Sequence, residues 1–358
     1  MRVIYQMEPW LGEEEKEEII RCLDSGWITE AKRTRQFEEM FAQYVGSRYA
    51  CAVTSGTISL AVALMALSVG PGDEVIVPDL TMIASANAVR LAGATPVLAD
   101  TELETLGLDV AAVERTLTPR TKAIMPVHFN GRAPNMERLL ALAYRHDLAV
   151  VEDAAQALGS RHQGKHLGSF GQIGCFSLST PKIITTGQGG VLVTNSSELQ
   201  EHIICLKDHG RLNRADDNHP VLGFNFKFTD MQAAIGIAQL RKLEERVGWK
   251  KEMYHLYREE LSAIEAIRFA TTELEQTCPW FIDIMVPDPQ ALQAFLEERG
   301  IQTRLFYKPL HTQPVYAREG PFPNAEEASR HGIFLPSSSF LSDSDIRYIC
   351  QQIKEFYA

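Results

Sequence analysis

The sequence predicts an α/β protein with a large, mostly parallel, helix-covered sheet and a smaller α+β C-terminal part. Strand-like and helix-like segments alternate from about residue 48 to 195, which is typical of a parallel sheet covered by helices. A long helical stretch at about 230–262 separates this alternation from a last segment of mixed strands and helices. We expect a large domain at 1–245, N-terminal segment included, and a small domain at 246–358.

The elements of the large part follow from apolar spacing and turn residues. An acidic helix is expected at 12–25 and ends near Gly26, and Phe37, Met40 and Phe41 line one face of a second helix at 34–44. The remaining elements alternate in type, with strands at 49–53, 74–77, 95–100, 122–127 and 148–153 and helices at 58–68, 109–116 and 136–146.

The C-terminal part mixes both element types. We expect a strand at 280–286, a helix at 289–299, an extended run at 302–307 and a last helix from 342.

Composition narrows the class of protein. The chain has 358 residues, 45% of them hydrophobic, and a net charge of −11, which disfavours general binding to nucleic acid or anionic membranes. It has neither a long apolar signal core nor an apolar run long enough to cross a bilayer, so we expect a soluble cytoplasmic protein. Its six scattered cysteines indicate buried reduced thiols and favour no metal site.

The most informative stretch is residues 148–195. One apolar strand ends at Asp153, a second ends at Ser177, and a short turn then carries Lys182 ahead of Gly189 and Gly190. A lysine amine can hold the aldehyde of pyridoxal 5′-phosphate (PLP) as a Schiff base, and a buried carboxylate can keep the pyridine nitrogen protonated. Taken singly, each residue is more often a surface or capping group.

The segment Thr54-Ser55-Gly56-Thr57 lies between a strand and a helix. Such a turn can bind an anion, because backbone N–H groups and the positive end of the helix point at the ligand. Ordinary N-capping by Thr54 or Ser55 is the alternative interpretation.

Three stretches resemble the DegT/DnrJ/EryC1/StrS family, PLP-dependent sugar aminotransferases with the aspartate aminotransferase fold (fold type I). They are Glu-Asp-Ala-Ala-Gln at 152–156, Phe176-Ser177 followed by Lys182, and Thr-Thr-Gly-Gln-Gly-Gly at 185–190. The resemblance covers nearly the whole chain and implies a mostly parallel seven-stranded sheet. It also implies a homodimer with shared active sites.

The resemblance assigns roles residue by residue. It implies that Lys182 carries PLP and moves protons, that Asp153 pairs with the ring nitrogen, and that Gln156 flanks the 3′-oxygen. The segment 223–236 resembles the family's Gly-x-Asn-x-Arg stretch, so Asn225 is expected to reach the PLP phosphate of the neighbouring subunit. The expected phosphate ligands are Ser55, Gly56, Thr57, Ser177 and Asn225.

Further residues are expected around the cofactor and the substrate. Met82 stands where the family usually has an aromatic residue, and we expect its thioether to lie over the ring, with a core position as the alternative. Trp27, Lys308 and His311 are candidate substrate contacts, although packing or solvation explains each as well. His128 is expected to be a hydrogen-bonded structural residue.

Lysine at 182 favours transamination, because sugar 3-dehydratases of this family carry histidine there. The resemblance implies L-glutamate as amino donor and a keto-deoxy sugar, commonly nucleotide-linked, as acceptor. The chain looks closest to the perosamine-synthase branch, which aminates C4 of a GDP-4-keto-6-deoxy sugar. Departures from the family pattern leave a 3-keto hexose or a keto-octulosonate open; they are Glu30-Ala31-Lys32-Arg33, Met82, Asn130, Gln188 and Lys227.

Two other functions are alternatives to transamination. One is a non-catalytic, PLP-binding regulatory protein of the same fold. The other is a nicotinamide-dependent enzyme, which the sequence disfavours because no Gly-x-Gly-x-x-Gly follows its first strand.

Overall fold

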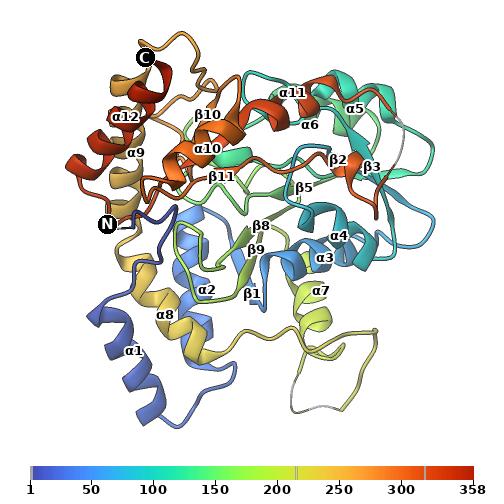
Figure 1. Cartoon of the computed structure of the whole chain (residues 1–358). Helices are drawn as coiled ribbons and strands as arrows, with labels where there is room; N and C mark the ends of the chain where they lie inside the picture. The colour runs from blue at the N-terminus through green and yellow to red at the C-terminus, as the bar shows by residue number, and fades with distance from the viewer. Residues whose placement is uncertain (1–2, 214, 216, 318–319) are drawn as a thin grey trace.

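The computed structural model describes residues 3–213, 215, 217–317 and 320–358 (Figure 1). Its large sheet has seven strands in the order β1-β9-β8-β5-β4-β2-β3, and only β9 runs antiparallel to its neighbours. The predicted mostly parallel seven-stranded sheet is therefore confirmed. The strands are β1 Tyr49–Val53, β2 Glu74–Pro78, β3 Thr95–Ala99, β4 Thr121–Ile124, β5 Ala149–Asp153, β8 Ile173–Ser177 and β9 Gly190–Thr194.

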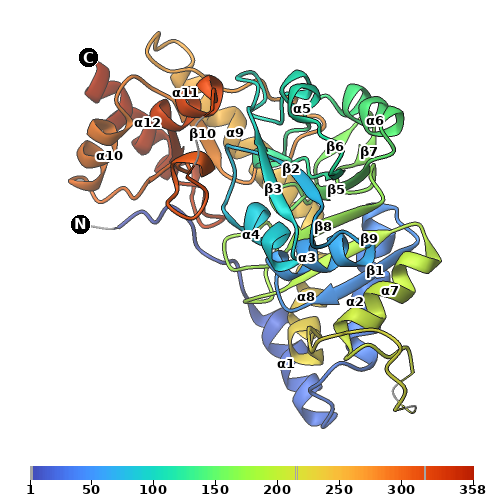
Figure 2. The ribbon, with the colours of Figure 1, turned by 90° about the vertical axis from the view of Figure 1, so that its right-hand side faces the viewer.

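Helices cover both faces of this sheet. Successive strand residues point to opposite faces, so Val75 and Val77 join one hydrophobic cluster while Ile76 joins another. Figure 2 shows α5 and α6 on one side of β2 and β3 and α4 on the other. The helices of this part are α1 Glu13–Asp24, α2 Lys32–Val45, α3 Gly56–Ala66, α4 Ala84–Leu91, α5 Val110–Thr116, α6 Met136–Arg145 and α7 Ser197–Lys207.

A small three-stranded antiparallel sheet, in the order β10-β12-β11, belongs to the C-terminal part (Figure 1). A separate hydrophobic cluster joins it to α9, α10 and α12 and includes Ile4 near the N-terminus. The domain division at 245 stays a prediction. The elements are α9 Leu243–Leu261, β10 Ile282–Met285, α10 Pro289–Glu297, β11 Arg304–Leu305, α11 Pro323–His331, β12 Gly332–Leu335 and α12 Asp343–Tyr357.

The expected single helix at 230–262 is wrong. The chain forms α8 (Asp230–Arg241) and then α9, and the two are separated at Lys242, whose φ of −111° and ψ of 15° interrupt the helix. The Lys242 amine bonds to Glu15 at 3.0 Å and lies over the Trp10 ring. Contacts with the N-terminal segment therefore accompany the break, where the local sequence has neither proline nor glycine.

All six cysteines are buried and free, as the sequence predicted. Among the described residues, no helix is long and apolar enough to cross a membrane. The same part of the chain holds no group of three or more histidine, cysteine or acidic side chains arranged to bind a metal ion.

Candidate active site

The carboxyl ends of the parallel strands meet at one edge of the large sheet. Asp153 is the last residue of β5, Ser177 is the last residue of β8, and Ser55 follows β1 by two residues. Ligands of parallel α/β sheets bind at this edge. The sheet topology therefore brings together residues that are more than a hundred positions apart in the sequence.

Asp153 is a buried carboxylate held by two donors. The Ser85 hydroxyl donates to its Oδ2 at 2.7 Å, and the backbone N–H of Ala155 donates to its Oδ1 at 3.1 Å. Burial raises the pKa of Asp153, and the bonds from Ser85 and Ala155 oppose this rise. A carboxylate fixed in this way can pair with a protonated ring nitrogen.

Lys182 lies in the turn after β8 and is partly buried. Its backbone N–H donates to Ser179 O at 2.9 Å, which closes the turn. Burial lowers the pKa of the amine to about 7, while the charge of Asp153 acts in the opposite direction. A substantial share of the amine is thus uncharged near neutral pH and able to attack an aldehyde.

The turn at residues 55–57, named here the phosphate turn, packs closely against two strands. A Cβ on Gly56 would lie 2.8 Å from Ser177 Cβ, and one on Gly190 would lie 2.3 Å from Ser55 O. Ser55 also caps α3, because its Oγ accepts from Ile58 N at 3.3 Å, so the capping interpretation is correct as well. Gly56 and Thr57 begin α3, and the N–H groups of a first helical turn have no partner within the helix, so they are available to an anion.

Comparison with known proteins decides the family. Residues 9–354 match the model of the DegT/DnrJ/EryC1/StrS aminotransferase family. The chain belongs to this family. The lysine, the buried carboxylate and the glycine-lined phosphate turn are the groups that PLP requires, so the residues present fit the cofactor.

Individual relatives cover nearly the whole chain. It is 38% identical to the GDP-perosamine synthase of Escherichia coli O157:H7 over 100% of both chains. The S. venezuelae DesV structure, solved with a ketimine intermediate, is 35% identical over 96% of this chain and 94% of its own, with a TM-score of 0.92. A Streptococcus pneumoniae aminotransferase solved in its PMP form is 27% identical over 99% and 97%, with a TM-score of 0.94. The protein is a PLP-dependent aminotransferase.

The other predicted cofactor residues lie around the same sheet edge. Gln156 follows β5 by three residues, is buried, and accepts from Asn130 N at 2.8 Å through its Oε1. Met82 is 46% exposed, and its carbonyl accepts from the Ser85 hydroxyl that binds Asp153. A core position for Met82 is therefore wrong, and its contact with the PLP ring stays a prediction.

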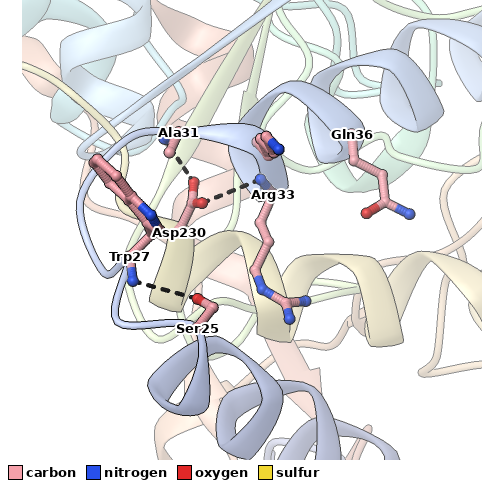
Figure 3. Close-up of a pocket in the computed structure, with 7 residues that line it drawn as sticks. Ser25, Trp27, Ala31, Arg33, Gln36 and Asp230 are labelled. Atoms are coloured by element: carbon pink, nitrogen blue, oxygen red, sulfur yellow. Dashed lines mark hydrogen bonds between the residues drawn. The ribbon is translucent and has the colours of Figure 1, made fainter.

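Trp27 lines an open pocket of about 540 Å³ between α1 and α2 (Figure 3). Its side chain is 69% exposed, so packing does not explain it within a single chain. Asp230 lies under the pocket, and its carboxylate accepts from Ala31 N at 2.8 Å and from Arg33 N at 3.1 Å. None of the residues that line the pocket is a predicted PLP ligand, so the substrate role of Trp27 stays a prediction.

Glu30 is a departure that we expected to affect substrate recognition, and this expectation is wrong for its side chain. Glu30 is only 4% exposed and pairs with Arg35 at 2.8 Å and with Lys207 at 3.2 Å. It belongs to a buried ion cluster beneath β1, which consists of Glu30, Glu38 and Lys207. Ala31, Lys32 and Arg33 do line the pocket beside Trp27.

His311 is held on one side by Asp79, which follows β2. Its backbone N–H donates to Asp79 Oδ1 at 2.8 Å, its Nδ1 lies 2.6 Å from Asp79 Oδ2, and its ring stacks on Phe322. Lys308 is exposed. The role of both residues as substrate contacts stays a prediction.

His128 is the structural residue that the sequence predicted. It is fully buried, and its Nε2 lies 2.8 Å from Glu152 Oε2. Glu152 also accepts from the backbone N–H groups of Gly168 and Gly171, so the pair ties the end of β4 to the loop before β8.

The other residues that differ from the family pattern are bonded to nearby residues of the chain. Lys227 forms an ion pair with Asp208 at 2.7 Å, and the carbonyl of the exposed Gln188 accepts from Gln232. Asn130 is fully buried and bonds to β10 rather than facing an open pocket. Asn225 is exposed, and its contact with the PLP phosphate of a neighbouring subunit stays a prediction.

Two residues at this site were not predicted as functional. Ser85 holds Asp153, and the ring of Trp280 lies under the Lys182 amine. Ser85 carried no distinguishing signal in its small-residue helix. Trp280 precedes a strand and looks like any core aromatic in the sequence.

Proposed function

We propose that this enzyme transfers the amino group of L-glutamate to C4 of a nucleotide-linked 4-keto-6-deoxyhexose. The full-length, 38% identity to a GDP-perosamine synthase carries the choice of substrate. Two further relatives of that name, from Caulobacter vibrioides and Vibrio cholerae, support it. Such a product suits surface-polysaccharide or secondary-metabolite biosynthesis.

Different residues at the sheet edge hold different parts of the cofactor. PLP supplies an electron-accepting ring when it is bound. Asp153 holds the proton of the ring nitrogen, and its burial strengthens this pairing because the site is poorly screened. The phosphate turn and Ser177 anchor the opposite end of the cofactor, so that the ring stays beside Lys182.

Lys182 moves the protons. With a pKa near neutral, its amine would take a proton from the donor's α-carbon, which bears the amino nitrogen, and return it to the cofactor carbon on the other side of that nitrogen. The same proton transfers, made in the opposite order, complete the amination of the keto sugar. A base whose pKa lies close to the working pH suits both directions of this exchange.

We infer that the enzyme is a homodimer in which Asn225 of the partner subunit completes the phosphate site. Two observations support this arrangement. Asn225 is exposed, and Lys227, two residues further on, forms an isolated β-bridge with Val53 at the end of β1, just before the phosphate turn. Mixing inactive Lys182→Ala chains with inactive Asn225→Ala chains should restore part of the activity, because one site of each mixed dimer is intact. Mixtures as inactive as their parents would contradict shared sites. The expected cytoplasmic location stays a prediction.

The substrate is tested with purified enzyme, L-glutamate and a panel of keto sugars. The panel holds GDP-, dTDP- and UDP-linked 4-keto-6-deoxyhexoses, a 3-keto hexose and a keto-octulosonate, and mass spectrometry detects the amine. We expect amination of a 4-keto sugar and none with Lys182→Ala. If glutamate converts the cofactor but only another sugar is aminated, the substrate proposal is wrong. If glutamate does not react, the protein is the regulatory homologue instead.

A further inference from the structure

Trp280 contacts two adjacent residues, Pro181 and Lys182, in the turn after β8. The Lys182 Nζ lies 3.7 Å from the centroid of its indole ring, and the indole N–H donates to Pro181 O at 2.6 Å. Trp280 is only 2% exposed and comes from the segment just before β10, about a hundred positions further along the chain. Face and edge of one side chain therefore fix both the amine and the backbone that carries it.

We propose that Trp280 is a positioning residue that holds the free Lys182 amine beside the cofactor site between proton transfers. The inference rests on the role of Lys182 given under the proposed function. It adds the residue that keeps a long, flexible side chain in one place while its amine is not attached to PLP.

The indole face is suited to this task. An aromatic face attracts an ammonium group, and the attraction is stronger where water is excluded. A lysine side chain otherwise has four rotatable bonds, and its amine samples many positions. Holding the amine over one ring shortens the search for the carbon that exchanges a proton.

The position of Trp280 is itself fixed by the large sheet. Asn130, which follows β4, accepts from Phe281 N and donates to Phe281 O, both at 2.7 Å. The ring of Phe281 stacks on that of Trp280 with centroids 3.9 Å apart. Arg132 adds a buried ion pair to Asp283 in β10.

Asn130 also links this frame to the cofactor side of the site. Its backbone N–H donates to Gln156 Oε1 at 2.8 Å, and its side chain bonds to Asp283 Oδ1 at 2.6 Å. Asn130 adopts a φ of 53°, a left-handed backbone that asparagine tolerates better than most residues. Gln156 is thus linked through Asn130 and Phe281 to Trp280, which in turn bonds to Pro181, the residue before Lys182.

The first test uses the apoenzyme and requires no catalysis. Tryptophan labelled with ¹⁵N gives an indole N–H signal for each of the four tryptophans, and Trp280→Phe identifies the one from Trp280. We expect this signal to shift as Lys182 titrates, with a midpoint near pH 7, and to stay constant in Lys182→Met. The Trp249 signal is the control and should not follow that titration. A Trp280 signal that ignores pH in the unmodified enzyme overturns the proposal.

The second test is the single-turnover reaction of the PLP-loaded enzyme with L-glutamate. Trp280→Leu removes the aromatic face, and we expect a loss of about 10-fold with a displaced pH profile. Trp280→Phe keeps a face but not the indole N–H, and should recover most of the rate. Trp249→Phe, on α9, is the matched control and should behave like the unmodified enzyme.

The outcomes separate this inference from the substrate proposal. If both tests succeed and no 4-keto sugar is aminated, the substrate is wrong and the role of Trp280 stands. If Trp280→Leu reacts with glutamate at the normal rate and with the normal pH profile, Trp280 does not position the amine. Should Trp280→Leu fail to fold, the titration of the unmodified apoenzyme still decides the question.

Discussion

The Ser85 hydroxyl donates to the Asp153 carboxylate at 2.7 Å, and both groups are buried. Ser85 lies in the first turn of α4, whereas Asp153 ends β5 in the middle of the large sheet. This bond lowers the pKa of a carboxyl group that burial raises. A serine on a covering helix therefore helps to keep the residue expected to face the PLP ring ionised.

Removing that hydroxyl should weaken catalysis most at low pH. In Ser85→Ala the pKa of Asp153 rises, so the carboxylate becomes protonated at a higher pH and pairs less well with the ring nitrogen. One hydrogen bond of this kind contributes about 1 kcal/mol, which corresponds to roughly five-fold in rate. The measurement is the pH profile of the glutamate half-reaction, whose acid limb should move to higher pH. Ser169→Ala, another buried serine, is the control, and a superimposable profile for Ser85→Ala would refute the assignment.

The Lys182 amine should titrate far below ordinary lysines. Its pKa of about 7 means that it is mostly protonated at pH 6 and mostly free at pH 8 in the apoenzyme. Competitive acetylation across pH, read peptide by peptide, should give a midpoint near 7 for Lys182, well below the value of about 10.4 for lysine in model peptides. Asp153→Asn removes a charge that raises this pKa, so the Lys182 midpoint should fall further. A midpoint above 9 for Lys182 would be inconsistent with a desolvated amine.

Adding a side chain to the phosphate turn should lower the affinity for PLP. In Gly56→Ala the new Cβ meets Ser177 at 2.8 Å, and such overpacking costs about 1–3 kcal/mol, or about 10-fold or more in affinity. PLP affinity is measured by absorbance after dialysis. Gly248→Ala on α9 is the matched control, because its Cβ would meet nothing within 4 Å and alanine favours a helix. Equal PLP affinity for both variants would show that the cofactor phosphate lies elsewhere.

The buried ion cluster beneath β1 should matter for stability. Lys207 is 1% exposed and pairs with Glu30 and Glu38, both at 3.2 Å, while its amine also donates to Ala52 O at 2.8 Å. Lys207→Met leaves two buried carboxylates without this cation, so the free energy of unfolding should fall by about 3–5 kcal/mol.

Urea denaturation of the apoenzyme measures that change. Lys122→Met, at an exposed position, is the control and should stay within about 0.5 kcal/mol of the unmodified chain. A Lys207→Met variant as stable as this control would mean that the cluster contributes little.

Much of the large sheet could be predicted because its information is local. Buried parallel strands such as Glu74–Pro78 are apolar runs flanked by turn residues, and Asp153 and Ser177 end two of them. Once strand direction is known, the side chains at the strand ends must meet at one edge. The central site residues could therefore be named without coordinates.

The parts that escaped prediction depend on distant contacts. Lys242 breaks the helix between α8 and α9 next to Glu15 and Trp10, more than two hundred positions away. Glu30 looks like a loop acid in the sequence, yet Lys207 makes it a buried ion-pair partner. The contact between Trp280 and Lys182 likewise joins the turn after β8 to the segment before β10, about a hundred positions further along the chain.

The central claim is that Lys182 carries the cofactor, and one measurement tests it most directly. Borohydride treatment of the PLP-loaded enzyme fixes the cofactor covalently to the lysine that holds it, and peptide mapping by mass spectrometry then locates the label. The structure predicts a single labelled peptide, the one that contains Lys182, and no label in Lys182→Ala. A label on another lysine, or none at all, would contradict the account.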